Sequence, residues 1–389
     1  MKVVVILPTY NEKGNIDRLI KILEEEIFPK ITHHDMSILV ADDNSPDGTA
    51  DVVHTYMKKW KNIAIVSGPK HGLGAAYIRG MTYAIEKMDA DIMFEMDADG
   101  QHDPTKIPQF LKKIDEGYDM VIGTRYSGGG SIPPNWPIQR KAFSIFGNIL
   151  VRTILTRFSI HDWTGGYRAI KKEVFLKEKD ELTNFKGYTF QVSFLHKAVR
   201  DGFEIAEVPF NFTDRTLGKS KIAPAEYIVD LLKYIIVARI KELVFGKFGK
   251  FLVVGGIGFV VNFLVLKVLS DTYHWNHSLA NLAGAALAIF SNFNFNNIWT
   301  FKDQRSNTIS NYIFKLMQFY ATSAFGVIFI QTGTIFLGDH LIGEGTLHFL
   351  ISIKYYLIYF VVGTGLLLIW NFFMYSKFIW RKSNKARAS

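Results

Sequence analysis

Two carboxylates, two residues apart, are the clearest candidates for chemistry in this 389-residue sequence. They belong to the segment DADGQ at residues 97–101, directly after the apolar run Asp91–Met96, which we expect to be a buried strand. Asp97 and Asp99 can bind one hard cation there, and the amide oxygen of Gln101 can be a third ligand. Because Mg²⁺ and Mn²⁺ fill their remaining positions with substrate phosphate and water, the segment predicts a site for Mg²⁺ or Mn²⁺ and a phosphorylated substrate.

Polar segments also follow two earlier apolar runs. PTYNE at residues 8–12 ends the first run and offers an aromatic face and acceptors to a nucleobase. DDNSPD at residues 42–47 ends the second, and its carboxylates suit ribose hydroxyls. Each segment alone also fits a helix cap or a turn. Three such segments at one sheet edge are much less easily explained by chance, and together they indicate a nucleotide site.

Several other chemistries are excluded or disfavoured. The chain has no cysteine, which rules out disulfides, zinc–thiolate sites, iron–sulfur clusters and cysteine nucleophiles. It has no Walker A lysine motif, and no GxGxxG follows the first expected strand, which disfavours P-loop and dinucleotide chemistry.

The expected strands and helices that position these residues are short and alternate along the chain. Expected strands alternate with expected helices of 10–15 residues, a pattern typical of parallel βαβ units with ligands at the carboxyl ends of the strands. The expected strands are Lys2–Pro8, Ser37–Ala41, Ile63–Ser67 and Asp91–Met96. The expected helices are Asn15–Glu26, Ala50–Trp60 and Gly74–Met88.

The pattern changes near residue 248. Four later stretches lack any charged residue and are near or above the length that crosses a bilayer. They are Phe251–Leu266, Thr272–Phe301, Leu316–Gly338 and Tyr355–Ser376. The alternative, four buried helices of a soluble domain, is unusual for so short a region. We therefore expect four membrane-spanning helices.

Charge placement predicts the orientation of these helices. Residues 249–389 hold 11 Lys and Arg but only 4 Asp and Glu, so most of the formal net charge of +9 flanks apolar segments. This favours a membrane over nucleic acid as the partner. The expected outer loops Asp271–His277 and Asp339–Thr346 lack Lys and Arg, whereas Lys302–Phe314 and the tail contain them. By the positive-inside rule, we expect a multi-pass protein of the cell membrane with its N-terminal domain in the cytosol.

Two further patterns concern the second half. Asn292 and Asn371 each precede an aromatic–basic end by nine residues, which predicts a duplicated helical hairpin, although an aromatic belt explains part of the pattern. Between the halves, Pro224–Gly246 has apolar residues at helical spacing interrupted by charges. This fits an amphipathic helix on the membrane surface, a last helix of the soluble domain, or both.

Seven motifs together resemble the inverting glycosyltransferases of family 2 with a GT-A fold, and most closely the polyprenyl-phosphate hexose synthases of the dolichol-phosphate mannose type. The motifs are PTYNE at 8–12, DDNSPDGT at 42–49, MDADGQHDP at 96–104, GTRY at 123–126, NWPIQRK at 135–141, DWTGGYRA at 162–169 and RTLGKSK at 215–221. Residues 249–389 resemble a GtrA-like four-helix membrane domain. This implies an α/β GT-A (Rossmann-like) domain at 1–222, an amphipathic interfacial region at 223–248 and an all-α transmembrane domain at 249–389.

The resemblance also implies roles for individual residues. The nucleotide-sugar would be bound by Pro8, Tyr10, Glu12, Asp42, Asp43, Asp97, Arg215 and Lys221. The metal ligands would be Asp97, Asp99 and Gln101, and the lipid phosphate would meet Arg125, Arg140 and Ser144. The residues closest to catalysis would be Asp99, Arg125, Arg140 and Arg215. Two departures from the family pattern leave the sugar and the lipid open: DWTGGY stands where DPTSGF is common, and Asn44 where a third Asp is common.

The implied reaction is inverting transfer of a hexose, foremost mannose from GDP-mannose, to a dolichyl or other polyprenyl monophosphate in the bilayer. Two alternatives stay open at this point. One is the same chemistry with UDP-glucose or another UDP-hexose. The other is a flippase for lipid-linked sugars whose soluble domain is degenerate, which the intact metal segment and both arginines argue against.

Overall fold

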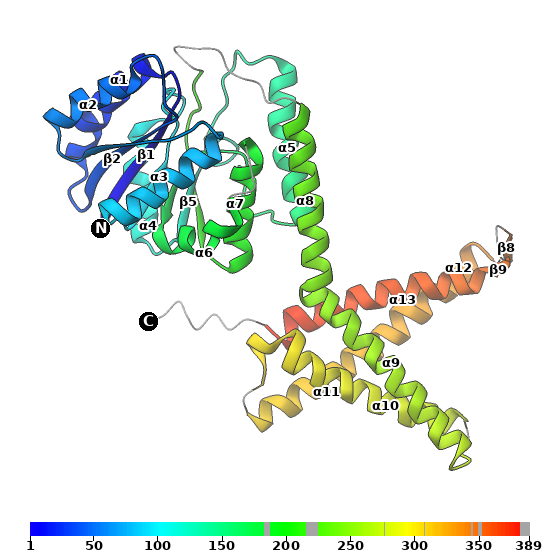
Figure 1. Ribbon diagram of the computed structural model, residues 1–389. Coiled ribbons are helices and arrows are strands. Elements are labelled where there is room, and N and C mark those ends of the chain that lie inside the picture. Colours follow the sequence, from blue (N-terminus) through cyan, green and yellow to red (C-terminus); the bar gives the residue numbers. More distant parts are fainter. Residues whose placement is uncertain are drawn as a thin grey trace. The chain divides into compact units, whose positions relative to one another are not determined.

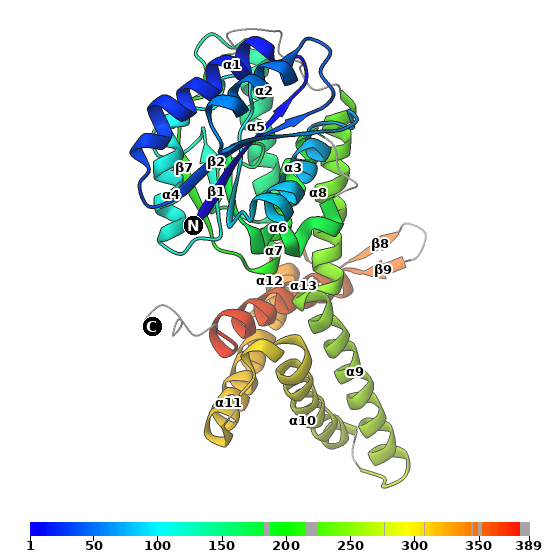
Figure 2. The same ribbon diagram turned by 60° about the vertical axis from the view of Figure 1, so that its left-hand side comes forward.

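A computed structural model of the chain describes residues 1–182, 187–214, 225–275, 277–306, 308–343, 345–348 and 352–381. The chain divides into two compact units, Met1–Arg239 and Ile240–Ser389. Figures 1 and 2 show their helices and strands from two directions.

The first unit alternates strands and helices along most of its length. Its elements are β1 (Lys2–Thr9), α1 (Lys13–Lys21), β2 (Asp35–Asp42), α2 (Thr49–Lys59), β3 (Ile63–Ser67), α3 (Leu73–Met88), β4 (Ile92–Glu95), α4 (Ile107–Asp115), β5 (Met120–Thr124), α5 (Ile138–Leu155), β6 (Arg168–Lys171), α6 (Lys172–Leu182), α7 (Gly187–Asp201), β7 (Ile205–Pro209) and α8 (Ala225–Phe245), which ends in the second unit. The strands and helices expected up to residue 96 are confirmed, with ends that differ by a few residues.

The strands form one mixed sheet in the order β3-β2-β1-β4-β6-β5-β7. β1 is parallel to β2 and β4, and β2 is parallel to β3, as the alternating pattern predicted. β6 is antiparallel to both β4 and β5. The register pairs Thr9 with Asp42 and Ile6 with Glu95, so the polar segments after β1, β2 and β4 begin at one edge of the sheet.

Helices cover both faces of this sheet (Figure 1). Strand side chains alternate between the two faces, and in β1 Val3, Val5 and Leu7 pack in the core under α1, α2 and α4. Val4 and Ile6 point to the opposite core, which contains residues of α3, α6 and α7. Ile235 of α8 is fully buried in that second core, so this part of α8 packs as a last helix of the first unit.

The second unit is mainly helical. Its elements are α9 (Lys247–Asp271), α10 (His277–Phe295), α11 (Ile309–Phe325), α12 (Thr332–Leu341), the short antiparallel pair β8 (Thr346–His348) and β9 (Ser352–Lys354), and α13 (Tyr355–Met374). Within the described residues, three helices are long and apolar enough to cross a membrane: Ile228–Leu269, Ile309–Ile330 and Val361–Ile379. Each expected stretch contains helix, but a count of four spanning helices is not confirmed.

Two segments of the second unit share an unusual ending. α10 runs into a π-helical turn at Asn296–Thr300, and α13 runs into one at Tyr375–Ile379. Phe301 and Trp380, the residues after these turns, are fully buried and stack with their ring centroids 4.7 Å apart. The indole Nε1 of Trp380 also donates to Asn297 Oδ1 at 3.0 Å. This local match supports the duplication predicted from the sequence, whose extension to whole hairpins remains a prediction.

We expect Trp380→Ala to lower the thermal unfolding midpoint of the detergent-solubilised chain clearly. It removes a fully buried indole, and such truncations cost about 3–5 kcal/mol in protein cores. Trp299→Ala is the matched control, because Trp299 is 40% exposed and its loss should cost far less. Equal shifts of the two midpoints would contradict a packing role for the stacked pair.

Candidate active site

The turn after β4 holds its two aspartates in different ways. Asp99 is buried, and its Oδ1 accepts the backbone N–H of Gln101 at 3.1 Å. Gly100 between them has φ of +78°, a left-handed conformation that glycine adopts at little cost. The Gln101 amide donates from Nε2 to the Thr213 carbonyl at 3.2 Å, which ties the turn to the segment after β7.

Asp97 is fixed by two neighbouring aromatic side chains. The hydroxyl of Tyr77, on α3, donates to Asp97 Oδ1 at 2.9 Å. The Asp97 N–H donates to His102 Nδ1 at 3.0 Å, so this ring nitrogen carries no proton. Burial lowers the pKa of His102 to about 4, which keeps the ring neutral near pH 7. Burial also raises the pKa of Tyr77 well above its usual range, so the phenol remains a donor.

The turn fits a hard divalent cation. Its potential ligands are the carboxylates of Asp97 and Asp99 and the amide of Gln101, all oxygen donors of the kind that Mg²⁺ and Mn²⁺ prefer. In the described part of the chain, no group of three His, Asp or Glu side chains forms a complete metal site. The donor set therefore suits a cation that completes its shell with substrate phosphate and water.

The two carboxylates after β2 form hydrogen bonds and an ion pair with other residues of the protein. Asp42 Oδ1 accepts from the hydroxyls of Thr9 (2.8 Å) and Ser45 (2.6 Å), and its Oδ2 accepts the Ser45 N–H at 2.8 Å. Asp43 forms an ion pair with Arg79 of α3 at 2.7 Å. Asp42 therefore shapes the turn, and Arg79 compensates the charge of Asp43.

The structure gives a physical reason for Asn44. Its φ is +54°, in the left-handed region that Asn tolerates better than most residues. Asparagine at the position where the family often has Asp is therefore compatible with the turn geometry.

The segment after β1 presents one aromatic ring to solvent. Tyr10 is 36% exposed, and Lys70, from the loop after β3, places Nζ 3.3 Å from the Tyr10 ring centroid. Glu12 accepts at Oε2 from the Asn15 amide at 2.6 Å, while Pro8 lies at the end of β1 opposite Ala41. The ring of Tyr10 thus lies exposed at the edge where the nucleobase was predicted, with the Lys70 ammonium over one of its faces.

Arg125, just after β5, forms a buried bidentate ion pair with Asp162. Its Nε donates to Asp162 Oδ2 and its Nη2 to Oδ1, both at 2.7 Å. Burial acts to raise the pKa of Asp162, but the charge and hydrogen bonds of Arg125 outweigh it, and the net pKa lies below the usual value. Nη2 also donates to the Thr164 hydroxyl at 2.9 Å.

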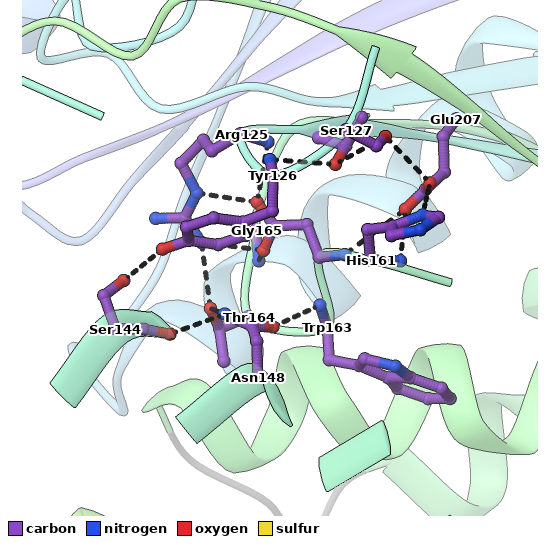
Figure 3. Close-up of polar contacts among 12 residues, drawn as sticks. Arg125, Tyr126, Ser127, Ser144, Asn148, His161, Trp163, Thr164, Gly165 and Glu207 are labelled. Atoms are coloured by element: carbon purple, nitrogen blue, oxygen red, sulfur yellow. Dashed lines mark hydrogen bonds and ion pairs between the residues drawn. The ribbon is translucent and has the colours of Figure 1, made fainter. Parts of the chain in front are cut away.

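Asn148 of α5 connects this pair to Ser144 (Figure 3). Its amide donates to the Ser144 carbonyl at 2.9 Å and to Thr164 Oγ1 at 3.3 Å. The Ser144 and Tyr126 hydroxyls form a hydrogen bond, with their oxygens 2.5 Å apart. Asn148 Oδ1 accepts the Trp163 N–H at 2.7 Å, a bond that proline could not form, which explains one departure of DWTGGY from DPTSGF.

Arg140 lies one turn before Ser144 on α5, in a different set of contacts. Its guanidinium carbon is 3.7 Å from the ring centroid of Trp136. Trp136 Nε1 donates to Asp214 Oδ1 at 2.7 Å, and Arg140 Nη1 is 4.0 Å from the same oxygen. Farther along α5, the apolar side chains of Phe143, Phe146 and Ile149 are largely exposed.

The described residues place the predicted site residues in several local groups of contacts. Arg125 and Ser144 are connected through Tyr126, Thr164 and Asn148, whereas Arg140 pairs with the Trp136–Asp214 group. Arg215 and Lys221 lie outside the described residues. Sequence reasoning gave no role to Asp162, Tyr77, His102, Arg79 or Lys70; of these, only Asp162 and His102 stood within the quoted motifs.

Two buried groups near the turn, Glu95 and His102, should change the folding stability in opposite directions as the pH rises. Burial raises the pKa of Glu95 from 4.5 to about 7, although Arg168 acts in the opposite direction. The folded state then binds more protons at Glu95, and stability falls as the pH rises from about 4.5 to 7. The pKa of His102 falls from 6.5 to about 4, so its contribution to stability rises over nearly the same range.

We therefore expect Glu95→Gln to reveal the His102 contribution. The thermal midpoint of this variant should rise more steeply than that of the parent chain between pH 4 and 6.5. The His102 contribution to the free energy of unfolding over this range is about 3 kcal/mol. Thermal unfolding at several pH values measures the slopes. Parallel slopes for variant and parent would show that the buried carboxyl does not titrate in this range.

Comparison with known proteins covers both units. The model of Glycosyl transferase family 2 matches residues 4–177, and that of the GtrA/DPMS transmembrane domain matches residues 250–380. The chain is 34% identical to the dolichol-phosphate mannosyltransferase of Pyrococcus furiosus, over 87% of this chain and 92% of that protein. It is 36% identical to the polyprenol monophosphomannose synthase of Mycolicibacterium smegmatis, over 57% of this chain and 81% of that protein.

A solved structure of glucosyl-3-phosphoglycerate synthase from Mycobacterium tuberculosis, in complex with Mn²⁺, UDP and glucosyl-3-phosphoglycerate, overlaps with a TM-score of 0.42 at 20% identity, over 62% of this chain and 79% of that one. The sequence matches to the relatives and to both domain families are much stronger. The chain is a membrane-bound glycosyltransferase that belongs to family 2, among the polyprenyl-phosphate glycosyltransferases with a GtrA/DPMS transmembrane domain.

Proposed function

We propose that the chain transfers mannose from GDP-mannose, with inversion, to a polyprenyl or dolichyl monophosphate at the cytosolic face of the cell membrane. The observation that carries this proposal is the match to a dolichol-phosphate mannosyltransferase across both units. The turn at Asp97–Gln101 and the pair of Arg125 with Asp162 add chemical support, because one suits a metal–diphosphate and the other lies beside a second phosphate-binding candidate, Ser144.

The reaction needs little acid–base chemistry from the protein. The lipid monophosphate is already an anion near pH 7, so its oxygen can attack the anomeric carbon without a general base. The nucleoside diphosphate leaves from the opposite face, which inverts the configuration. When bound, Mg²⁺ or Mn²⁺ held by Asp97, Asp99 and Gln101 would neutralise charge on that leaving group. The remaining contribution is alignment of donor and acceptor.

The acceptor phosphate would lie near Arg125, Arg140 and Ser144. Asp162 holds the Arg125 guanidinium in one orientation, and Trp136 supports that of Arg140. A planar guanidinium suits bidentate binding of phosphate, an argument that applies to Arg140, whose ion pair is long, because Nε and Nη2 of Arg125 already donate to Asp162. The exposed apolar side chains of α5 are on the same helix as Arg140 and Ser144, which suits an acceptor whose tail is a hydrocarbon. In the proposal, Arg215 and Lys221 add donors to the diphosphate.

A transfer assay on the full chain in detergent tests the function. GDP-mannose and UDP-glucose are offered separately with a polyprenyl monophosphate and Mg²⁺ or Mn²⁺, with and without EDTA. We expect mannosyl lipid from GDP-mannose, and none after EDTA. Transfer from UDP-glucose alone would keep the mechanism and replace the donor. Failure with both donors would count against this function.

A further inference from the structure

The hydroxyl of Tyr77 holds one particular oxygen of Asp97. It donates to Asp97 Oδ1 at 2.9 Å, and Tyr77 itself is fully buried, whereas the Asp97 side chain is 30% exposed. The bond therefore reaches the carboxylate from the protein interior. The proposed mechanism gives this phenol no part, although it contacts one of the expected metal ligands directly.

Close packing of α3 fixes the position of this hydroxyl. At Gly80, about one turn after Tyr77, a Cβ would lie only 2.6 Å from Ile6 Cγ2 of β1. At Gly74, about one turn before, a Cβ would lie 2.8 Å from the ring of Phe190 on α7. The Phe190 ring is nearly parallel to that of Tyr77, with an interplanar angle of 7° and centroids 6.4 Å apart. The phenol is thus held between the sheet and α7, in a densely packed interior that resists its displacement.

The other oxygen donors of the turn are restrained in a similar way. Asp99 Oδ1 accepts the Gln101 N–H at 3.1 Å. The Gln101 amide nitrogen donates to the Thr213 carbonyl at 3.2 Å, which leaves Oε1 as the amide atom that can bind a cation. A carboxylate with one oxygen in such a hydrogen bond binds a cation through its other oxygen. The turn therefore presents single oxygens rather than bidentate carboxylates.

Divalent cations differ in their response to such a ligand set. Mg²⁺ requires a nearly octahedral shell, binds one or two carboxylates and keeps phosphate oxygens and water in its other positions, and Mn²⁺ also accepts octahedral oxygen shells. Ca²⁺ is larger, takes about 6–8 oxygens and uses bidentate carboxylates to reach that number. Ligands limited to one oxygen each therefore favour the smaller cations.

We propose that Tyr77 is a positioning residue that selects the cation bound at this turn. By holding Asp97 Oδ1, it keeps the carboxylate monodentate and favours Mg²⁺ and Mn²⁺ over Ca²⁺. Without the hydroxyl, the carboxylate can turn and present both oxygens, which suits Ca²⁺. The inference rests on the proposed function, which supplies the metal-bound donor.

The test measures binding of Mn²⁺, Mg²⁺ and Ca²⁺ to the full chain in detergent by calorimetry, each alone, with GDP and with UDP. We expect the parent chain to prefer Mn²⁺ and Mg²⁺. Tyr77→Phe should weaken Mn²⁺ about tenfold, as loss of a partner of a metal ligand commonly does, and should affect Ca²⁺ much less. Tyr56→Phe is the matched control. It removes a hydroxyl that donates to Asp17 Oδ1 at 2.6 Å and should leave the cation preference unchanged.

Three results would overturn the inference. They are equal weakening of all three cations by Tyr77→Phe, no weakening of any, and a parent chain that binds Ca²⁺ as tightly as Mg²⁺. The last result does not depend on the stability of the variant. Mannose transfer by the same preparations separates the inference from the proposed function. A parent chain that transfers mannose while Tyr77→Phe keeps the parent's cation preference refutes the inference alone. The expected change in preference without any mannose transfer refutes the proposed function alone.

Discussion

Replacing Asp99 by asparagine should lower the transfer rate about a thousandfold. Asp99 is buried in the turn after β4, and its carboxylate is the most enclosed of the oxygen donors there. Stabilisation of a leaving diphosphate by a bound cation contributes several kcal/mol to the transition state, and asparagine removes the negative charge that would hold this cation. The Gln101 N–H can still bond to the amide oxygen, so the turn should keep its shape. Initial rates with saturating donor measure the effect.

Asp103→Asn is the control for this prediction. Asp103 lies four residues away and caps the next short helix by accepting the Thr105 N–H at 2.9 Å, a task that asparagine performs well. Its transfer rate should stay within a few-fold of the parent. Saturating EDTA should lower the transfer rate of the parent chain to that of Asp99→Asn. The transfer rate of Asp99→Asn itself should hardly change. An Asp99→Asn variant that transfers at a tenth of the parent rate, with the same sensitivity to EDTA, would argue against a metal at this turn.

The first four strands could be read from the sequence because each is a short apolar run between helices of clear periodicity. No comparable pattern predicted β6. Its four residues, Arg168–Lys171, begin with a buried arginine that pairs with Glu95 across the antiparallel register. Hydrophobic patterning shows that a segment is buried but not its direction. The direction follows from the loop before β6, which Asn148 and Arg125 hold through hydrogen bonds from distant segments.

In the site, too, some features could be predicted from the sequence and others could not. The segments after β1, β2 and β4 were predictable because each carries several polar residues at the end of an apolar run. Their partners were not, since Tyr77 and Arg79 reach Asp97 and Asp43 from α3, 20 and 36 residues away. Lys70 contacts Tyr10 from the loop after β3, a strand that lies two places from β1 in the sheet. Asp162 was within a quoted motif, but nothing in the spacing indicated that Arg125 would be its partner.

Breaking the pair of Arg125 and Asp162 should have the largest effect on stability in the first unit. Asp162 is fully buried and Arg125 is 9% exposed, so Asp162→Asn leaves a guanidinium without its counter-charge in the interior. Such losses cost about 3–5 kcal/mol. Because Arg125 lowers the pKa of Asp162, the carboxylate contributes stability at all pH values above about 4 and loses it only below. Thermal unfolding at pH 7 measures the cost.

The double variant Arg125→Met with Asp162→Leu separates structure from catalysis. Apolar side chains of similar size often replace a buried ion pair without loss. Asp162 also accepts the backbone N–H groups of Arg125 and Gly165, so the double variant should recover only part of the stability that either single change removes. If Arg125 also meets the acceptor phosphate, transfer should stay near zero in this partly restored protein. Arg140→Met is the stability control, because Arg140 is partly exposed and its ion pair is long. A stable double variant that transfers mannose normally would show that the pair only holds the loop, and the acceptor phosphate would then have to rely on Arg140 and Ser144.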